Sequence, residues 1–201
     1  MSVRRLGKEQ PASFSFTPEN EAWAEATIRK YPPGREASAI IPLFWRAQEQ
    51  CGGWLPEPAI NAIGQRLGMT YIRAVEVATF YTMFNLEPVG KHLIQVCTTT
   101  PCWLRGSDAV VAACKKHIHP KQNTISADGV FSWMEVECLG GCANAPVVQI
   151  ASDYYEDLDG PAMERILETL RAGGTPKAGS AIGRVSSEPH GHVTTLTEVT
   201  H

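Results

Sequence analysis

The stretch HLIQVCTTTPC, residues 92–102, places a run typical of a β-strand directly before two cysteines. The apolar and β-branched residues of this run predict a strand that ends at Cys97. Four residues, three threonines and Pro101, separate Cys97 from Cys102. Such a pair is compatible with a disulfide, a redox dithiol, half of a metal site or simple core packing. Its meaning therefore depends on the rest of the chain.

A second pair, Cys138 and Cys142, lies in CLGGC, 35 residues beyond the first pair, where a second predicted strand ends. Strand ends of one sheet can bring both loops to the same edge, so that four thiolates converge. A 2Fe-2S cluster takes four thiolates, two on each iron. The two pairs favour such a cluster, most naturally with one pair on each iron.

Three other interpretations compete at this point. Structural zinc sites commonly use two-residue spacers, whereas the spacers here are four and three residues. A thioredoxin-type dithiol uses C-x-x-C, which neither pair matches. Four unconnected core cysteines would require two close pairs to arise by chance. The cluster is favoured, and zinc and unconnected thiols remain open.

The residues around the pairs suit sulfur ligation. Gly140 and Gly141 allow the backbone to come close to the sulfurs. Pro101 stiffens the turn before Cys102. Hydroxyl and amide donors that tune a cluster are expected from three threonines, Thr98, Thr99 and Thr100.

The remaining candidate ligands are predicted to have structural roles. Cys114 lies on the apolar face of a predicted helix and Cys51 at a helix end, so both are expected to be small buried hydrophobes. His117 and His119 lie at the basic end of the same helix as Cys114, where they complement the helix dipole. The sequence Gly-Arg-Val-Ser in the tail is not a phosphate loop, because no strand precedes it and no helix follows.

Hydrophobic periodicity predicts a helical bundle over residues 1–88. One predicted helix face joins Ile60, Ile63 and Leu67, and the next joins Val77, Phe80, Tyr81 and Phe84. Four helices are expected, over residues 18–31, 37–50, 57–68 and 70–84.

Residues 89–174 change to strands alternating with helices, which predicts an α/β domain with a mixed sheet. Strands are expected at 92–96, 129–137, 146–151 and 153–157, and helices at 106–118 and 160–174. The apolar faces expected to lie inward are Val111, Cys114 and Ile118 on the first of these helices and Met163, Ile166, Leu167 and Leu170 on the second. Residues 175–201 are rich in Gly, Ser, Thr and Pro without periodicity, which predicts an extended C-terminal tail.

Composition and patterning argue against several classes of function. A chain of 201 residues with a formal net charge of −3 has no basic excess for nucleic acid. Its most apolar run, residues 39–45, is far shorter than the roughly 20 residues that cross a bilayer. The N-terminal residues lack the apolar core of a secretory signal, so a reducing compartment is expected, where disulfides are rare. No dinucleotide-binding turn or catalytic triad is recognisable, which predicts no active site within the chain itself.

CTTTPCWLRG, VECLGGCANAPVVQI and the preceding EVATFYTMF resemble the 24-kDa (NuoE-type) 2Fe-2S subunits of respiratory complex I, NADH:quinone oxidoreductase. The resemblance extends from about residue 14 to 175. It implies a helical N-terminal region followed by a thioredoxin-like domain, and one 2Fe-2S cluster on Cys97, Cys102, Cys138 and Cys142.

The resemblance also implies partners. In the family, the 24-kDa protein packs against a flavin subunit of the 51-kDa type, which holds FMN and the NADH site, and the large iron-sulfur subunit lies in the same peripheral arm. The cluster exchanges one electron with the flavin and limits the lifetime of one-electron-reduced flavin. The expected location is peripheral, on the cytoplasmic side of a bacterial inner membrane, or on the matrix side in a mitochondrion.

Two alternatives come from related proteins. NAD-linked formate dehydrogenases and NAD-reducing hydrogenases contain a similar 2Fe-2S subunit in their diaphorase parts. A free thioredoxin-like ferredoxin would be a shuttle without a stable complex, and would lack the helical N-terminal region.

The aromatic residues of that region, such as Trp45, Trp54, Phe80 and Tyr81, indicate a docking element if they are exposed and a bundle core if they are buried. For each residue alone, a core position is the prediction.

Overall fold

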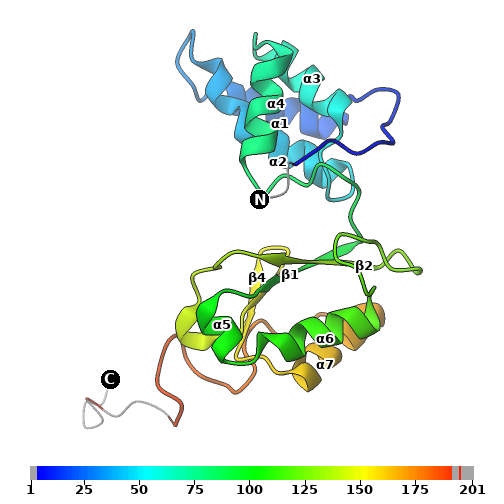
Figure 1. Cartoon of the computed structure of the whole chain (residues 1–201). Helices are drawn as coiled ribbons and strands as arrows, with labels where there is room; N and C mark the ends of the chain where they lie inside the picture. The colour runs from blue at the N-terminus through cyan, green and yellow to red at the C-terminus, as the bar shows by residue number, and fades with distance from the viewer. Residues whose placement is uncertain (1–3, 192–194, 196–201) are drawn as a thin grey trace. The chain divides into compact units, whose positions relative to one another are not determined.

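The computed structural model describes residues 4–191 and 195. The chain forms two compact units, Met1–Val89 and Gly90–His201, which are drawn in Figure 1 and described separately below. Across the described residues, seven α-helices and a mixed five-stranded sheet make up a mixed α/β protein. None of the helices in this part of the chain is long and apolar enough to span a bilayer.

The first unit is helical, as its periodicity predicts. Thr17 caps its first helix by accepting a hydrogen bond from the Asn20 amide at 3.3 Å, with proline at the first helical position. The helices are α1 (Pro18–Ile28), the 3₁₀ turn η1 (Glu36–Ala39), α2 (Ile40–Gln50), α3 (Glu57–Arg66) and α4 (Tyr71–Phe80).

The core of the first unit forms where these helices meet. Leu43 and Phe44 of α2 are fully buried, as are Ile60 and Ile63 of α3. The prediction of a helix over residues 70–84 was correct up to Phe80 and wrong beyond it. The helix ends at Phe80 because Tyr81 adopts an extended conformation, so the four aromatic and apolar residues expected on one face do not share one.

The exposed aromatic residues of the first unit differ from the expectation of a core position. Phe80 is 74% exposed, whereas Phe84 beyond the helix end is buried. The residues of α4 that face inward are Ala74 and Ala78. The largest apolar side chains of this helix, Tyr71, Ile72 and Phe80, therefore lie on the surface, and its two buried residues are alanines.

The second unit is built on a sheet with the strand order β2-β1-β3-β4-β5. β1 and β2 are parallel, β3 runs antiparallel to β1 and β4 to β3, and β5 is parallel to β4. Its elements are β1 (His92–Cys97), α5 (Thr100–Leu104), α6 (Ser107–His117), β2 (Phe131–Val136), the 3₁₀ turn η2 (Cys142–Asn144), β3 (Val148–Ile150), β4 (Asp153–Glu156), α7 (Gly160–Arg171) and β5 (Gly179–Ser180).

Helices α6 and α7 lie side by side on one face of this sheet (Figure 1). The side chains predicted to face inward from α6, Val111, Cys114 and Ile118, are buried there against the strands. Met163 and Leu167 of α7 are fully buried in the same core. The helical periodicity of this half of the chain therefore gave the correct buried faces.

One α-helix and one strand were not predicted. The loop after Cys97 contains the five-residue helix α5, on which Cys102 lies. In the segment predicted as an extended tail, Gly179 and Ser180 form β5 beside β4, and the residues that follow make further contacts with the unit. Tertiary hydrogen bonds organise this segment although its own sequence has no periodic pattern. The rest of the predicted tail, residues 192–194 and 196–201, lies outside the described residues.

Candidate metal centre

The four predicted ligands lie at one edge of the sheet of the second unit. Cys97 is the last residue of β1, and its register partner on the parallel strand β2 is Val136. Cys138 follows two residues after that strand end. Cys102 lies on α5 directly after β1, and Cys142 begins η2 shortly after Cys138. Parallel pairing thus brings the two loops together, as the sequence predicts.

The thiols form two pairs in space as well as in sequence. The Sγ atoms of Cys138 and Cys142 are 3.4 Å apart. The thiols of Cys97 and Cys102 lie close enough that each shifts the pKa of the other. Electrostatic interactions also link Cys97 with both cysteines of the other pair. All four sulfurs therefore belong to one group.

This group has an apolar floor and an open side. Cys97 and Cys102 are 1% exposed and pack with Ala145 and Val147 in a small hydrophobic cluster of their own. The other pair is exposed. A cofactor on these sulfurs would be supported from below by apolar side chains and would reach the protein surface on the side of Cys138 and Cys142.

Hydrogen bonds reach the sulfurs from neighbouring residues. The Thr99 hydroxyl is 3.3 Å from the Sγ of Cys97, and the amide of Gly140 donates to the Sγ of Cys138 at 3.4 Å. Gly140 has a φ of +85°, a conformation that favours glycine and that turns its amide toward the sulfur. The Thr98 hydroxyl instead donates to Glu135 at 3.1 Å. Of the three predicted donor threonines, Thr99 is the one with a hydroxyl placed against a sulfur.

The pKa values diverge within the first pair. Burial acts to raise the pKa of Cys97, but hydrogen bonds from Thr99 and Cys102 outweigh it, and the pKa lies below its ordinary value. Burial raises the pKa of Cys102, and the hydrogen bond to Cys97 raises it further. Within this pair, the pKa of Cys97 therefore lies below that of Cys102.

The second pair divides in the same way. The Gly140 amide lowers the pKa of Cys138, and the hydrogen bond from Cys142 adds to this. The pKa of Cys142 is raised, first by its hydrogen bond to Cys138. Because metals bind thiolates, loading of the four sulfurs would release the remaining protons.

The residues fit a two-iron cluster. A 2Fe-2S cluster takes two thiolates on each iron, and the structure presents two thiol pairs whose members are close together. Within the described residues, no three His, Cys, Asp or Glu side chains come close enough to hold a single metal ion. The donor set is all sulfur, with hydroxyl and amide donors beside it, which is the environment that these clusters require.

The other cysteines and the histidines lie elsewhere. Cys114 is fully buried on α6, where burial raises its pKa to about 12. Burial also raises the pKa of Cys51, which is half-buried at the end of α2. His117 contacts Glu164 at 3.0 Å, and His119 accepts a hydrogen bond from the Lys121 amide at 3.0 Å. As predicted, Cys114 is a buried apolar residue, whereas the contacts of the two histidines were not predicted.

Sequence reasoning missed Tyr154 on β4. Its hydroxyl donates to the carbonyl of Leu139 at 2.8 Å, in the middle of the loop that connects Cys138 to Cys142. Tyr154 and Tyr155 point to opposite faces of the strand, and Tyr155 is buried beneath the helices. The strand alternation in DYYE predicts that the two tyrosines face opposite sides of the sheet. It does not predict that Tyr154 contacts the loop between Cys138 and Cys142.

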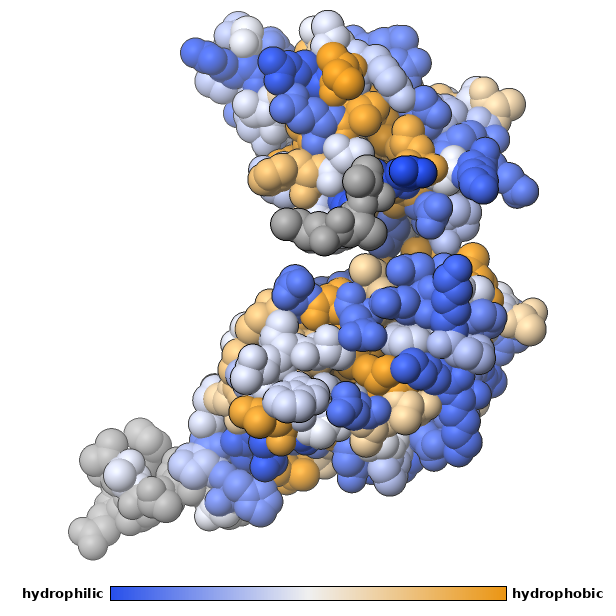
Figure 2. Space-filling model, viewed as in Figure 1, coloured by the Kyte–Doolittle hydropathy of each residue, from blue (hydrophilic) through white to orange (hydrophobic). Residues whose placement is uncertain are grey.

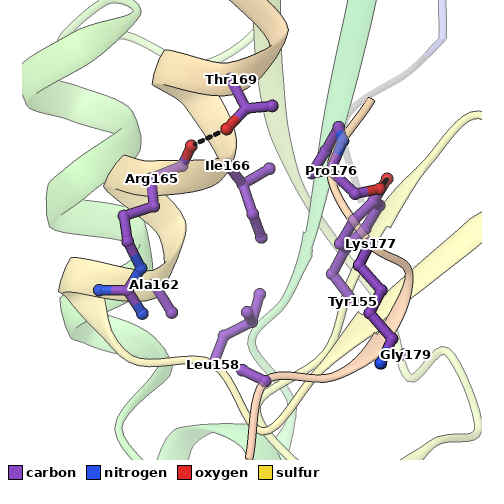
Figure 3. Close-up of a pocket in the computed structure, with 10 residues that line it drawn as sticks. Tyr155, Leu158, Ala162, Arg165, Ile166, Thr169, Pro176, Lys177 and Gly179 are labelled. Atoms are coloured by element: carbon purple, nitrogen blue, oxygen red, sulfur yellow. Dashed lines mark hydrogen bonds between the residues drawn. The ribbon is translucent and has the colours of Figure 1, made fainter. Parts of the chain in front are cut away.

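Two cavities lie away from the cysteines. One of about 260 Å³ opens between β4, α7 and the chain before β5, where Leu158 and Ile166 face Tyr155 and Pro176 (Figure 3). Another, of about 550 Å³, lies in the first unit beside Phe14 and Phe16. Neither is lined by a cysteine, so the thiol group is a surface site and not part of either cavity.

Comparison with known proteins places this site in a family. The profile of the family described as "Thioredoxin-like [2Fe-2S] ferredoxin" matches residues 24–171. The E 1 subunit of the NADH-quinone oxidoreductase of Rhizobium meliloti (strain 1021) is 52% identical over 201 residues, which cover 98% of this chain and 73% of that protein. The E subunit of the NADH-quinone oxidoreductase of Rickettsia bellii is 58% identical over 159 residues, covering 79% of this chain and 95% of that protein.

A solved structure shares the fold. The crystal structure of an NAD+-reducing [NiFe]-hydrogenase in the H2-reduced state superposes with a TM-score of 0.56 over 65% of this chain, at 18% identity. The match spans only 22% of that hydrogenase chain, so it bears on the fold alone. The family profile covers both thiol pairs and most of the two units. This chain belongs to the thioredoxin-like [2Fe-2S] ferredoxin family.

Proposed function

We propose that this chain is the electron-transferring NuoE-type component of an NADH-quinone oxidoreductase, with one 2Fe-2S cluster held by Cys97, Cys102, Cys138 and Cys142. The observation that carries the proposal is the gathering of two thiol pairs at the ends of β1 and β2. It occurs in a chain that is 52% identical, over 98% of its length, to a component of such an oxidoreductase.

The chemistry follows from the donor set. A 2Fe-2S cluster accepts and returns one electron at a time. The thiolates would hold the cluster, Ala145 and Val147 would exclude water from its inner side, and Thr99 and Gly140 would stabilise the charge on the sulfurs. The thiol group offers donors for iron and not for a nicotinamide or a flavin, so the chain acts as a subunit whose electrons come from a neighbour.

The exposed side of the site suits contact with that neighbour. Trp103 and Leu104 follow Cys102 directly and are 57% and 70% exposed. Cys138 and Cys142 of the same thiol group are exposed as well, so both cysteine loops present surface where an electron would enter. We assign this surface to the FMN- and NADH-binding subunit, with the large iron-sulfur subunit as a further neighbour in the same complex.

The first unit offers a second apolar surface. Tyr71, Ile72 and Phe80 of α4 are 43%, 68% and 74% exposed. Figure 2 shows apolar side chains gathered on the side of this unit that α4 crosses. Exposed apolar surface of this kind is typical of a subunit and not of a free shuttle protein. The proposed location is peripheral within a membrane complex, on the cytoplasmic side of a bacterial inner membrane.

The alternative is the corresponding subunit of a soluble NAD-linked formate dehydrogenase or NAD-reducing hydrogenase. The hydrogenase likeness is a likeness of fold at 18% identity, whereas the NADH-quinone oxidoreductase subunits are 52% and 58% identical. The oxidoreductase of the quinone type is therefore the better supported assignment.

Purification under mild detergent tests the proposal. We expect the chain to co-purify with a flavoprotein and with membrane subunits, and to contain two irons and two acid-labile sulfides per copy. The isolated chain should neither oxidise NADH nor retain FMN. Zinc without sulfide would overturn the cluster assignment, and co-purification with a soluble molybdenum or nickel enzyme would support the alternative.

A further inference from the structure

The chain beyond α7 returns to the turn that carries Cys142. We call residues 179–188 the C-terminal strap. It begins with β5, in which Gly179 pairs with Tyr155 of β4, and then passes beside η2. The family profile ends at residue 171, so the strap lies outside the part of the chain that defines the family.

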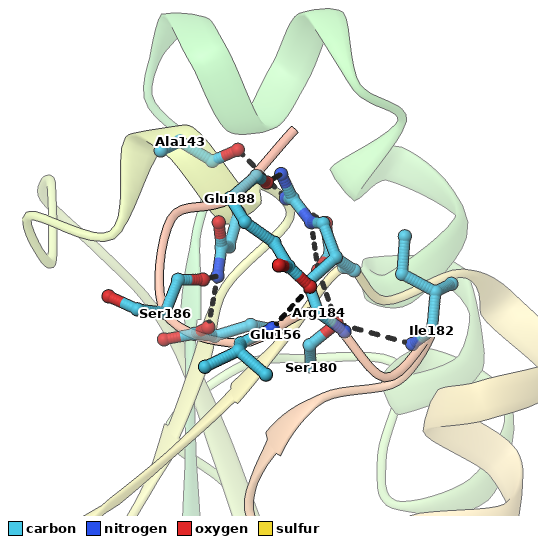
Figure 4. Close-up of polar contacts among 10 residues, drawn as sticks. Ala143, Glu156, Ser180, Ile182, Arg184, Ser186 and Glu188 are labelled. Atoms are coloured by element: carbon cyan, nitrogen blue, oxygen red, sulfur yellow. Dashed lines mark hydrogen bonds and ion pairs between the residues drawn. The ribbon is translucent and has the colours of Figure 1, made fainter. Parts of the chain in front are cut away.

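Arg184 is the centre of the strap. Its Nε donates to Oδ2 of Asp157 at 3.0 Å and its Nη2 to Oδ1, a two-point pairing in which the side chains are only 12% and 3% exposed. The same guanidinium donates through Nη1 to the Glu188 carbonyl and through Nη2 to the Ala143 carbonyl, both at 2.9 Å. Figure 4 shows Arg184 reaching from the strap toward Ala143.

The turn η2 is held at a second point by the same group of residues. The amide of Asp157 donates to the carbonyl of Asn144 at 2.7 Å. The side-chain amide of Asn144 donates to the Ser186 carbonyl at 2.7 Å and to Glu156 at 2.6 Å. The carbonyls of both residues that follow Cys142 are therefore fixed, one by Arg184 and one by its partner Asp157.

We propose that Arg184 is a positioning residue for Cys142. Through its pairing with Asp157 and its bond to Ala143, it holds the turn that presents the Cys142 sulfur and so controls how firmly that sulfur stays on the cluster. The inference rests on the proposed function, because it takes Cys142 as a ligand. Residues that orient ligands from outside the ligand set commonly change metal affinity by about 10- to 100-fold when replaced.

The arginine side chain is required for this geometry. Its planar guanidinium pairs with both carboxylate oxygens and still has donors left for the two carbonyls. A lysine keeps the charge but has a single nitrogen, which cannot make all of these bonds. Arg184→Lys should therefore retain attraction to Asp157 and hold the turn less firmly than arginine does.

Arg171 provides a matched control in the same unit. It also donates to an aspartate, Asp128, at 3.0 Å and to a backbone carbonyl, that of His117, at 2.9 Å. Neither of its partners belongs to the loops that carry the four cysteines. Arg171→Ala thus removes an ion pair and a carbonyl contact of the same kind without touching η2.

The test uses the full chain with its cluster reconstituted. Iron release to a chelator is followed by loss of visible absorbance, and the reduced cluster is examined by electron paramagnetic resonance. We expect Arg184→Ala to release iron about 10-fold faster than the unmodified chain and to change the line shape. Arg184→Lys should release iron faster than the unmodified chain but more slowly than Arg184→Ala. Arg171→Ala should match the unmodified chain in both its rate of iron release and its line shape.

The outcomes separate the two proposals. Unchanged release and unchanged spectra in both Arg184 variants would overturn the role of Arg184, and so would an equal acceleration in Arg171→Ala. If Arg184→Ala does not fold, Arg184→Lys decides the question by the same criteria. If the unmodified chain holds no iron and sulfide, the proposed function itself fails, whatever the variants do.

Discussion

Single cysteines of this chain differ in what surrounds the sulfur. Cys138 receives a hydrogen bond from the Gly140 amide and is exposed beside a second thiol. Cys114 is buried among apolar side chains of α6 and the sheet, and its pKa is raised to about 12. The first environment stabilises a thiolate and the second stabilises a neutral thiol.

Cys138→Ser should therefore weaken or abolish the cluster, because a hydroxyl is a poorer ligand for iron than a thiolate. Cys114→Ser should leave the cluster in place, although a hydroxyl in that apolar site lowers the stability of the unit by about 1–3 kcal/mol. Electron paramagnetic resonance of the reduced protein measures the cluster directly. Equal loss of signal from both variants would show that the ligand assignment is incorrect.

The contribution of Asp128 to folding stability should depend on pH. The Ser126 hydroxyl, the Val130 amide and the Arg171 guanidinium lower the pKa of this carboxyl from 3.8 to about 2. A carboxyl whose pKa is lower in the folded state contributes stability above its unfolded pKa, and this contribution disappears as the folded form is protonated. It is present above about pH 4 and is lost as the pH falls toward 2.

The stability difference between the unmodified chain and Asp128→Asn should accordingly be largest near neutral pH and shrink between pH 4 and pH 2. Chemical denaturation at several pH values measures it. Asp153→Asn, which changes an exposed carboxyl on β4, is the control. A difference that grows as the pH falls would contradict the stated sign.

Among the elements, α4 shows why amphipathic patterns fail in places. Its inward residues, Ala74 and Ala78, are small, and a Cβ added at Gly64 of α3 would lie 2.9 Å from the Cβ of Ala74. The two helices approach closely because both present small residues at their contact. A prediction based on large apolar residues places Phe80 in the core instead. It therefore assigns an exposed residue to the core and misses the two buried alanines.

The start of α7 is fixed by a side-chain cap. Asp159 accepts a hydrogen bond from the Ala162 amide at 2.7 Å, with proline in the first turn of the helix. Asp159→Ala should lower the free energy of unfolding of the second unit by about 1 kcal/mol. Glu168→Ala, an exposed change in the last turn of the same helix, should have a smaller effect in thermal denaturation. Equal effects would mean that the cap contributes nothing.

At the scale of the whole molecule, the two units have separate hydrophobic cores. The core of the first unit is centred on α2 and α3, and that of the second lies between the sheet and its two helices. The thiol group packs on a third, smaller cluster within the second unit. We therefore expect the units to respond separately to core substitutions.

Leu43→Ala is the test of this separation. Leu43 is fully buried in α2, and its truncation should destabilise the first unit by about 2–5 kcal/mol. The iron content and the resonance spectrum should be unchanged at temperatures where that unit remains folded. Leu167→Ala, an equally buried change in the core of the second unit, should by contrast accelerate iron loss. Parallel loss of iron in both variants would indicate one cooperative structure.

Much of the site was accessible from local sequence. Spacing alone grouped Cys97 with Cys102 and Cys138 with Cys142, and strand patterns placed both pairs after strand ends. The buried faces of α6 and α7 followed from helical periodicity. Such features are local, because a strand end or a helix face is encoded within about ten residues.

Tyr154 and Arg184 were not accessible in this way. Tyr154 reaches a carbonyl 15 residues earlier, and Arg184 reaches Asp157 and Ala143 across 27 and 41 residues. No periodic pattern marks either residue. Their partners are decided by which loops the folded sheet brings together, so the tail that composition predicts as extended is instead partly folded.

The sequence by itself determined the cysteine pairs, the order of the strands and helices other than α5 and β5, and the family, because these depend on residue identity and short spacing. The tertiary structure alone decided that β1 and β2 are parallel neighbours, that Thr99 and not Thr98 faces a sulfur, and that Arg184 holds the turn after Cys142. The physical reason is that hydrogen bonds and ion pairs act over a few ångströms in space. Contacts between residues that lie far apart in the sequence therefore cannot be predicted from local sequence patterns and form only when the chain folds.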